Sequence, residues 1–299
     1  MTSETRRIAP TTQDSAEILR DSRDSAKYVT TDAAPSAARY VGGAGPDVVL
    51  LHGLGSRWQV FQPIIPELER THRVHAFDLP GFGAEPNEPT LRPGIAGLAE
   101  WVTERMLATG VTRPHIVGNS MGAALALELG RRGVASRVTA FAPSGFGSEP
   151  ERIFAQTFLT AQRDVARRIP DRIGAALRTP LGRSILLAPS FGRPSQVAPE
   201  TAIADLHALA GASAFDTLRM SLRHEGPVGP NHRVPTVIVW GRRDVILPFL
   251  TQARRARVHY PYARHIALGG AGHLPFSDAP ATCAAIVTGT HPFVMDTAR

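Results

Sequence analysis

The chain has 299 residues, 43% of them hydrophobic, which suits one large α/β domain with an insertion or two smaller domains. No run of about 18 apolar residues occurs, so we expect no membrane-spanning helix. The net charge of +7 is almost entirely arginine, dispersed among acidic residues and without a nucleic-acid-binding motif. We therefore expect no nucleic-acid partner.

The first part of the chain differs from the rest. Residues 1–24 are polar and show no sustained hydrophobic period, which is typical of a flexible arm. Arg6 and Arg7 are not followed by an apolar stretch, so we expect no secretory signal and a cytoplasmic protein. The single cysteine, Cys283, excludes an internal disulfide and is expected to be a small core residue on the last helix.

Strand and helix signals alternate along most of the chain. Short apolar or β-branched runs predict eight strands, at residues 26–31, 37–41, 48–51, 73–77, 114–117, 138–141, 236–240 and 265–268. Apolar residues at helical spacing predict helices between them, at 95–106, 123–129, 248–257 and 280–288. This order predicts an α/β fold with a mostly parallel eight-stranded sheet, helices on both faces and ligands at the carboxyl ends of the strands.

One long segment interrupts the alternation. Residues 147–230 are rich in Ala, Leu and Arg and are broken by prolines at 170, 180, 189, 194 and 199. We interpret them as an inserted helical lid over a core formed by residues 25–146 and 231–299.

A Gly-X-Ser-X-Gly pentapeptide, residues 118–122, places Ser120 between a predicted strand and a predicted helix. In such a tight turn the flanking positions must be small, and the turn lifts the serine hydroxyl out of the backbone. The pentapeptide alone is weak evidence, because glycine and serine are common. It becomes informative only together with a base, an acid and an oxyanion site.

Two polar residues follow late predicted strands. Asp244 follows the strand at 236–240 after a short turn, and His273 follows the strand at 265–268 within a glycine-rich loop. The chain order Ser120, Asp244, His273 is the nucleophile, acid, base order of the α/β-hydrolase arrangement.

Five motifs in chain order resemble the α/β-hydrolase superfamily, of the lidded kind typified by small esterases and C–C bond hydrolases. They span about residues 48–275: His52-Gly53-Leu54-Gly55, Asp78–Gly83, Gly118–Gly122, Trp240–Asp244 and Gly272-His273. The resemblance implies that His273 deprotonates Ser120 and that Asp244 orients the imidazole. It also implies an oxyanion site formed by the backbone N–H groups of Leu54 and Met121.

Other residues compete for these roles. Asp278 and Asp216 are weaker candidates for the acid, and the other position that this fold can use, after the strand at 138–141, has no carboxylate. His265 and His224 compete for the role of base, but neither stands in a glycine-flanked loop after a late strand.

The substrate pocket is predicted from proximity to the motifs. Its candidate residues are His52, Gly53, Trp58, Asn119, Phe146 and Phe276. Each aromatic side chain fits the hydrophobic core equally well. His52 also fits a structural hydrogen-bonding role in the glycine turn, and Asn119 also fits a role in bracing the Ser120 turn.

These observations predict a serine hydrolase that cleaves a small-molecule ester, thioester or activated amide through an acyl-enzyme. No clustered His/Cys spacing and no phosphate loop occur, so we expect no metal and no cofactor. A C–C bond hydrolase of the meta-cleavage-product type is the nearest alternative, but Ser56-Arg57-Trp58 and Leu274-Pro275-Phe276 depart from that group. A cofactor-free haloperoxidase or perhydrolase uses the same triad, and a ligand-binding receptor is the alternative outside the enzymes. No pattern in the lid predicts the acyl group.

Overall fold

Seven strands form one sheet in the computed structural model, which describes residues 39–292. Their spatial order is β1-β3-β2-β4-β5-β6-β7, with bounds β1 (Arg39–Gly42), β2 (Asp47–Leu51), β3 (Arg73–Phe77), β4 (His115–Asn119), β5 (Arg137–Phe141), β6 (Thr236–Gly241) and β7 (Arg264–Leu268). Strand β1 is antiparallel to β3, and every other neighbouring pair is parallel, which confirms the predicted mostly parallel sheet. The expected arm at 1–24 and the expected eighth strand at 26–31 lie outside the described residues.

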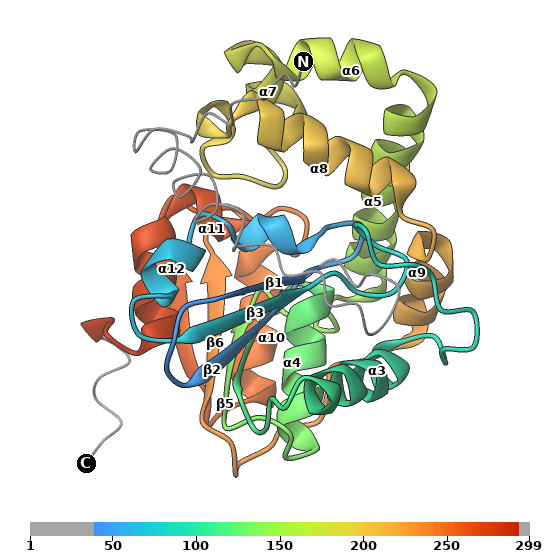
Figure 1. Cartoon of the computed structure of the whole chain (residues 1–299). Helices are drawn as coiled ribbons and strands as arrows, with labels where there is room; N and C mark the ends of the chain where they lie inside the picture. The colour runs from blue at the N-terminus through green and yellow to red at the C-terminus, as the bar shows by residue number, and fades with distance from the viewer. Residues whose placement is uncertain (1–38, 293–299) are drawn as a thin grey trace, which may run out of the picture.

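The sheet is buried on both faces because side chains along each central strand alternate between two hydrophobic clusters. Val49 and Leu51 point to one face, which is covered by α3 (Ile95–Ala108), α4 (Met121–Arg131) and α10 (Arg254–His259). Val48 and Leu50 point to the other, which is covered by η1 (Trp58–Phe61), α2 (Ile65–Leu68), α11 (Pro275–Asp278) and α12 (Pro280–Thr288). This two-sided burial explains why residues 48–51 are continuously apolar (Figure 1).

The segment between β5 and β6 is helical. It contains α5 (Glu149–Arg168), α6 (Pro170–Leu177), α7 (Pro180–Leu186), η2 (Pro194–Gln196), α8 (Pro199–Gly211) and α9 (Phe215–His224). Proline is the first residue of α6, α7 and α8, a position where its missing N–H would have had no helical partner. Helices α5 to α8 stand beyond the edge of the sheet at which Ser120 lies (Figure 1).

The loop after β3 closes around the buried Asp78 and contains a second buried carboxyl group, that of Glu85. Asp78 Oδ1 accepts a hydrogen bond from the Trp58 N–H at 2.7 Å. Gly83 has a φ of +55°, and a Cβ there would lie 2.1 Å from Asp78 Oδ2, so the turn requires glycine. Glu85 is buried in the same loop, 3.1 Å from Arg105 of α3. Burial raises the pKa of Glu85 to about 7, and Arg105 opposes that shift only in part.

We expect Glu85 to destabilise the protein above neutral pH. Its pKa in the folded protein lies above the ordinary 4.5, so the folded state binds the proton more tightly and stability falls as pH rises from about 4.5 to about 7. Glu85→Gln stays neutral at every pH. The free energy of unfolding of this variant minus that of wild type should therefore be roughly 2–3 kcal/mol more positive at pH 8 than at pH 4, which means that the variant gains stability relative to wild type. Urea denaturation at both pH values measures this. The same difference at both pH values would contradict it, and Glu104→Gln, at an exposed position of α3, is the control variant.

Candidate active site

Ser120 occupies a strained turn between β4 and α4. Its φ of +56° and ψ of −116° form a backbone conformation that residues with a Cβ rarely adopt. A Cβ on Gly118 would lie 2.0 Å from the Gly122 carbonyl oxygen, and one on Gly122 would lie 2.1 Å from the Leu51 carbonyl oxygen. Both flanking residues must therefore be glycine for α4 to start directly against the ends of β2 and β4. These backbone contacts explain why glycine stands two residues before and two residues after Ser120.

His273 and Asp244 are joined by a buried hydrogen bond. His273 Nδ1 lies 2.8 Å from Asp244 Oδ2, and both residues are more than nine-tenths buried. Asp244 Oδ1 accepts a second hydrogen bond, from the Leu247 N–H at 2.9 Å. A carboxylate on Nδ1 favours the tautomer with its proton there, which leaves Nε2 as an acceptor. The loops after β6 and β7 can hold these residues together because the two strands are parallel neighbours.

Ser120 and His273 line the same cavity. No hydrogen bond joins their side chains among the residues that the structure describes. Such bonds are often long without a substrate and shorten in the reacting complex. The geometry therefore places a nucleophile candidate and a base candidate at one cavity, with the base oriented by an acid.

Asn119 links the serine turn to the histidine loop. Its Nδ2 donates to the His273 carbonyl oxygen at 3.0 Å and, at 3.4 Å, to the Phe141 carbonyl oxygen. The residue is buried and also lines the cavity. A side chain next to Ser120 thus sets the position of the His273 backbone, a contact that spans 154 residues of sequence and that no local pattern indicates.

Backbone N–H groups without acceptors lie beside Ser120. Leu54 lines the cavity, and its N–H has no acceptor among the described residues. Met121 is the first residue of α4, where backbone N–H groups have no partner within the helix and the helix dipole favours negative charge. Gly53, the residue before Leu54, lies close to the serine, since a Cβ on it would be 3.6 Å from Ser120 Oγ.

His52 was a candidate pocket residue, and the structure places it in the core instead. It is fully buried, its Nδ1 donates to the Gly53 carbonyl oxygen at 2.8 Å, and its Nε2 accepts from the Leu79 N–H at 2.9 Å. Burial lowers the pKa of His52, in keeping with a neutral ring whose two nitrogens are both engaged. It therefore braces the glycine turn.

The three aromatic candidates for the pocket also lie away from Ser120. Trp58 stacks on Tyr40 with ring centres 5.3 Å apart, and Phe276 packs 4.7 Å from Phe61 on the same face of the sheet. Phe146 is buried against β6 and α10 and borders a different, outer groove. Of the candidate pocket residues, only Gly53 and Asn119 line the cavity with Ser120.

The rival acids and bases have other partners. Asp278 accepts hydrogen bonds from the backbone N–H groups of Gly192, Arg193 and Gly272 at 2.7 to 2.8 Å. It therefore fastens the loop before η2 to the loop that carries His273. Asp216 pairs with Arg163 at 2.7 Å inside the helical segment. The ring of His265 contacts the Tyr260 carbonyl oxygen at 2.9 Å, and His224 is exposed at the end of α9.

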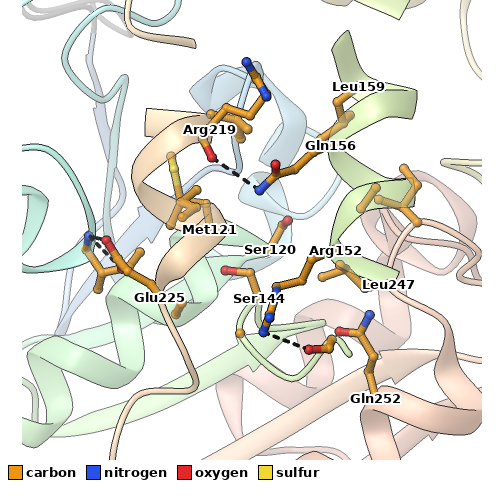
Figure 2. A pocket seen from close by; sticks show the side chains of 18 of the residues that line it. Ser120, Met121, Ser144, Arg152, Gln156, Leu159, Arg219, Glu225, Leu247 and Gln252 are labelled. Carbon is orange, nitrogen blue, oxygen red and sulfur yellow. Dashed lines mark hydrogen bonds between the residues drawn. The ribbon is translucent and has the colours of Figure 1, made fainter. Parts of the chain in front are cut away.

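Ser120 lines two cavities of different size. The larger, which we call the large chamber, has a volume of 420 Å³ and is lined by His273 and by mainly apolar side chains of α5 to α8. The smaller, which we call the small chamber, has a volume of 80 Å³. Its wall is also mainly apolar, but six polar side chains other than Ser120 interrupt it (Figure 2): Ser144, Arg152, Gln156, Arg219, Glu225 and Gln252. Ser120 and Leu54 line both chambers, whereas His273 lines only the large one.

An ion pair at the large chamber attaches the helical segment to the core. Arg57, before η1, lies with its Nε 2.9 Å from Asp205 Oδ1 of α8. Burial raises the pKa of Asp205, and Arg57 opposes the shift. Together with the Asp278 contacts, this pair fixes α8 and the loop before η2 over the cavity.

Cys283 is a buried core residue of α12. Its thiol donates to the Pro275 carbonyl oxygen at 3.5 Å, and burial raises its pKa. Residues 39–292 contain no group of three or more His, Cys, Asp or Glu side chains placed to bind a metal ion. Within the same range, no helix is both long and apolar enough to cross a membrane.

The chain is similar to known proteins in sequence and in fold. The model of the alpha/beta hydrolase family matches residues 48–286. Pimeloyl-(acyl-carrier protein) methyl ester esterase from Methylococcus capsulatus is 31% identical over 258 residues, which cover 78% of this chain and 90% of that protein. An esterase of the same name from Aeromonas hydrophila is 40% identical over 91 residues, which cover 29% of this chain and only a third (33%) of that protein. A thermophilic esterase from Thermogutta terrifontis shares the fold, with a TM-score of 0.67 at 20% identity over 87% of this chain and 96% of that chain.

Asp278→Ala should loosen the loops that flank His273. The substitution leaves three backbone N–H groups without their acceptor, so we expect the free energy of unfolding to fall by about 2–3 kcal/mol. Urea denaturation measures the loss, and hydrogen exchange should become faster at Gly192 and Gly272. Asp164→Ala, which removes a half-exposed carboxylate of α5, is the matched control. Unchanged exchange at both glycines would show that Asp278 does not fasten the two loops.

Proposed function

Because the chain belongs to the alpha/beta hydrolase family, we propose that it is a serine hydrolase that cleaves carboxylic esters through an acyl-enzyme. The observation that carries this proposal is the 2.8 Å hydrogen bond between Asp244 and His273, beside the cavity that Ser120 also lines. A serine hydroxyl is a weak nucleophile and needs an adjacent base. An imidazole whose Nδ1 is engaged by a buried carboxylate is suited to that role.

In the first step, Ser120 Oγ attacks the ester carbonyl carbon and its proton passes to His273 Nε2. Asp244 stabilises the imidazolium that forms. The carbonyl π electrons move onto the oxygen, which becomes an oxyanion. The N–H groups of Leu54 and Met121 stabilise this charge, each by on the order of 3 kcal/mol.

In the second step, the tetrahedral intermediate collapses. The bond to the alcohol oxygen breaks, His273 returns its proton to that oxygen, and the acyl group stays on Ser120. Water then attacks the acyl-enzyme with His273 as base. Collapse of the second intermediate releases the acid and restores the Ser120 hydroxyl.

The helical segment acts as a lid in this proposal. Residues 147–230, which include α5 to α9, supply the apolar wall of the large chamber and exclude water from the intermediates. The names of the relatives from Methylococcus capsulatus and Aeromonas hydrophila, both methyl ester esterases, favour a carboxylic ester over a thioester or a C–C bond.

Ser120→Ala should abolish turnover of short p-nitrophenyl esters. We expect kcat to fall by about 10⁴-fold or more, because no other hydroxyl replaces the nucleophile. Initial rates at saturating ester, followed by nitrophenolate absorbance, measure the loss. Ser136→Ala, which removes an exposed hydroxyl from the surface, should keep the wild-type rate. Full activity in Ser120→Ala would overturn the assignment of the nucleophile.

A further inference from the structure

The small chamber contains a buried polar side chain that the mechanism above does not use. Gln252 is fully buried, and neither Nε2 nor Oε1 of its amide has a hydrogen-bond partner among the described residues. The residue lies in η3 (Phe249–Ala253), a π-helix, which is a rare geometry found frequently at functional sites. A buried amide without partners is unfavourable unless a ligand supplies them. Gln252 therefore marks a binding position beside Ser120.

Arg152 lies next to Gln252. A Cβ on Gly147 would be 3.1 Å from Arg152 Cγ and 3.3 Å from Gln252 Nε2, so both side chains pack against the same glycine. Arg152 Nη1 donates to the Gly147 carbonyl oxygen at 3.1 Å, and no carboxylate pairs with the guanidinium in the described part of the chain. Figure 2 shows the Arg152 side chain extending from α5 toward Ser144 and Gln252. A cation and an amide donor thus face the chamber together.

One cation at the small chamber has no carboxylate partner. Arg152, Arg219 and Glu225 are the charged residues that line the chamber, and Arg219 pairs with Asp216, with its Nε 3.7 Å from Asp216 Oδ1, which leaves Arg152. The Glu225 carboxylate is engaged elsewhere, since it accepts from the Ile95 N–H at 3.3 Å and from Ser221 Oγ at 2.9 Å. The chamber therefore offers the Arg152 cation and the Gln252 amide donor to a group that enters it. A carboxylate matches both properties.

The position of His273 decides which part of an ester enters each chamber. His273 must protonate the departing alcohol oxygen, so the alcohol has to lie in the chamber that His273 lines. That chamber is the large apolar one. The acyl group then points away from His273, past Ser120, into the small chamber. A volume of 80 Å³ admits only a short acyl chain.

We propose that the substrate is an ester between a large apolar alcohol and a short acyl group that ends in a carboxylate. Arg152 and Gln252 bind that carboxylate in the small chamber while the alcohol fills the large chamber. Hydrolysis consumes one water and yields a short dicarboxylate and the apolar alcohol. This inference rests on the proposed serine hydrolase function and adds the substrate class to it.

Three esters test the proposal on the full chain. Octyl hydrogen succinate has the predicted form, octyl 4-methylpentanoate replaces its carboxylate by an isopropyl group, and 3-(nonanoyloxy)propanoate moves the carboxylate to the alcohol side. We expect kcat/KM for octyl hydrogen succinate to exceed that of each of the others by about tenfold or more. Equal or faster turnover of the neutral ester overturns the anion site, and faster turnover of the reversed ester overturns the assignment of the chambers. If none of the three is hydrolysed while short p-nitrophenyl esters are, the proposed substrate class fails and the serine hydrolase function stands; if the p-nitrophenyl esters are not hydrolysed either, the serine hydrolase function itself fails.

Substitutions in the small chamber test whether its residues cause the preference for the anionic ester. Arg152→Met removes the cation, and Gln252→Glu replaces the amide by a carboxylate of similar size that repels the anionic acyl end. Each should lower the ratio of kcat/KM for octyl hydrogen succinate to that for the neutral ester by about tenfold or more. Arg178→Met, which removes an exposed arginine at the end of α6, should leave the ratio unchanged. A melting temperature for each variant establishes that it is folded, and an unchanged ratio in either folded variant overturns the proposal.

Discussion

The backbone of Ser120 is fixed on both sides, and the rest of the site depends on this constraint. Its N–H donates to the Phe141 carbonyl oxygen at 2.9 Å, and its carbonyl oxygen accepts from the N–H groups of Ala123, Ala124 and Ser144 at 3.1 to 3.2 Å. A non-glycine residue at this φ and ψ costs on the order of 1–3 kcal/mol, and such a conformation persists only where its surroundings determine it. Here the end of β5 and the first turn of α4 do so, and the hydroxyl is presented to the cavity as a result.

The parallel sheet brings the partners of Ser120 to the same place. Strands β4, β5, β6 and β7 are consecutive neighbours, so the loops that follow them meet at one edge. Two side-chain contacts then hold the histidine loop at that edge, because Asn119 binds the His273 carbonyl oxygen and Asp278 binds the Gly272 N–H. The position of the histidine loop against the serine turn thus depends on Asn119, a side chain outside the proposed triad.

Local pattern predicted much of the fold and only part of the site. The apolar runs at 48–51 and 138–141 are strands, and the serine, acid and base candidates stand at strand ends, because burial on two faces and tight turns leave strong signals in sequence. The aromatic residues Trp58 and Phe276 fit core and pocket equally well in sequence, and only tertiary packing places them in the core. The helix expected at 248–257 begins with a π-turn, which has no sequence signature, so the burial of Gln252 beside Ser120 was not predictable.

In the proposed mechanism, Asp244 and His273 activate Ser120 as a nucleophile. The most direct test is the rate at which a fluorophosphonate modifies the folded protein, followed by intact mass and peptide mapping, in wild type and in Asp244→Asn. We expect one phosphonyl group per chain, on Ser120, and a rate that falls by at least about 100-fold in Asp244→Asn, where the imidazole loses the anion that orients and stabilises it. Absence of modification at Ser120, or an equal rate in the variant, would contradict it.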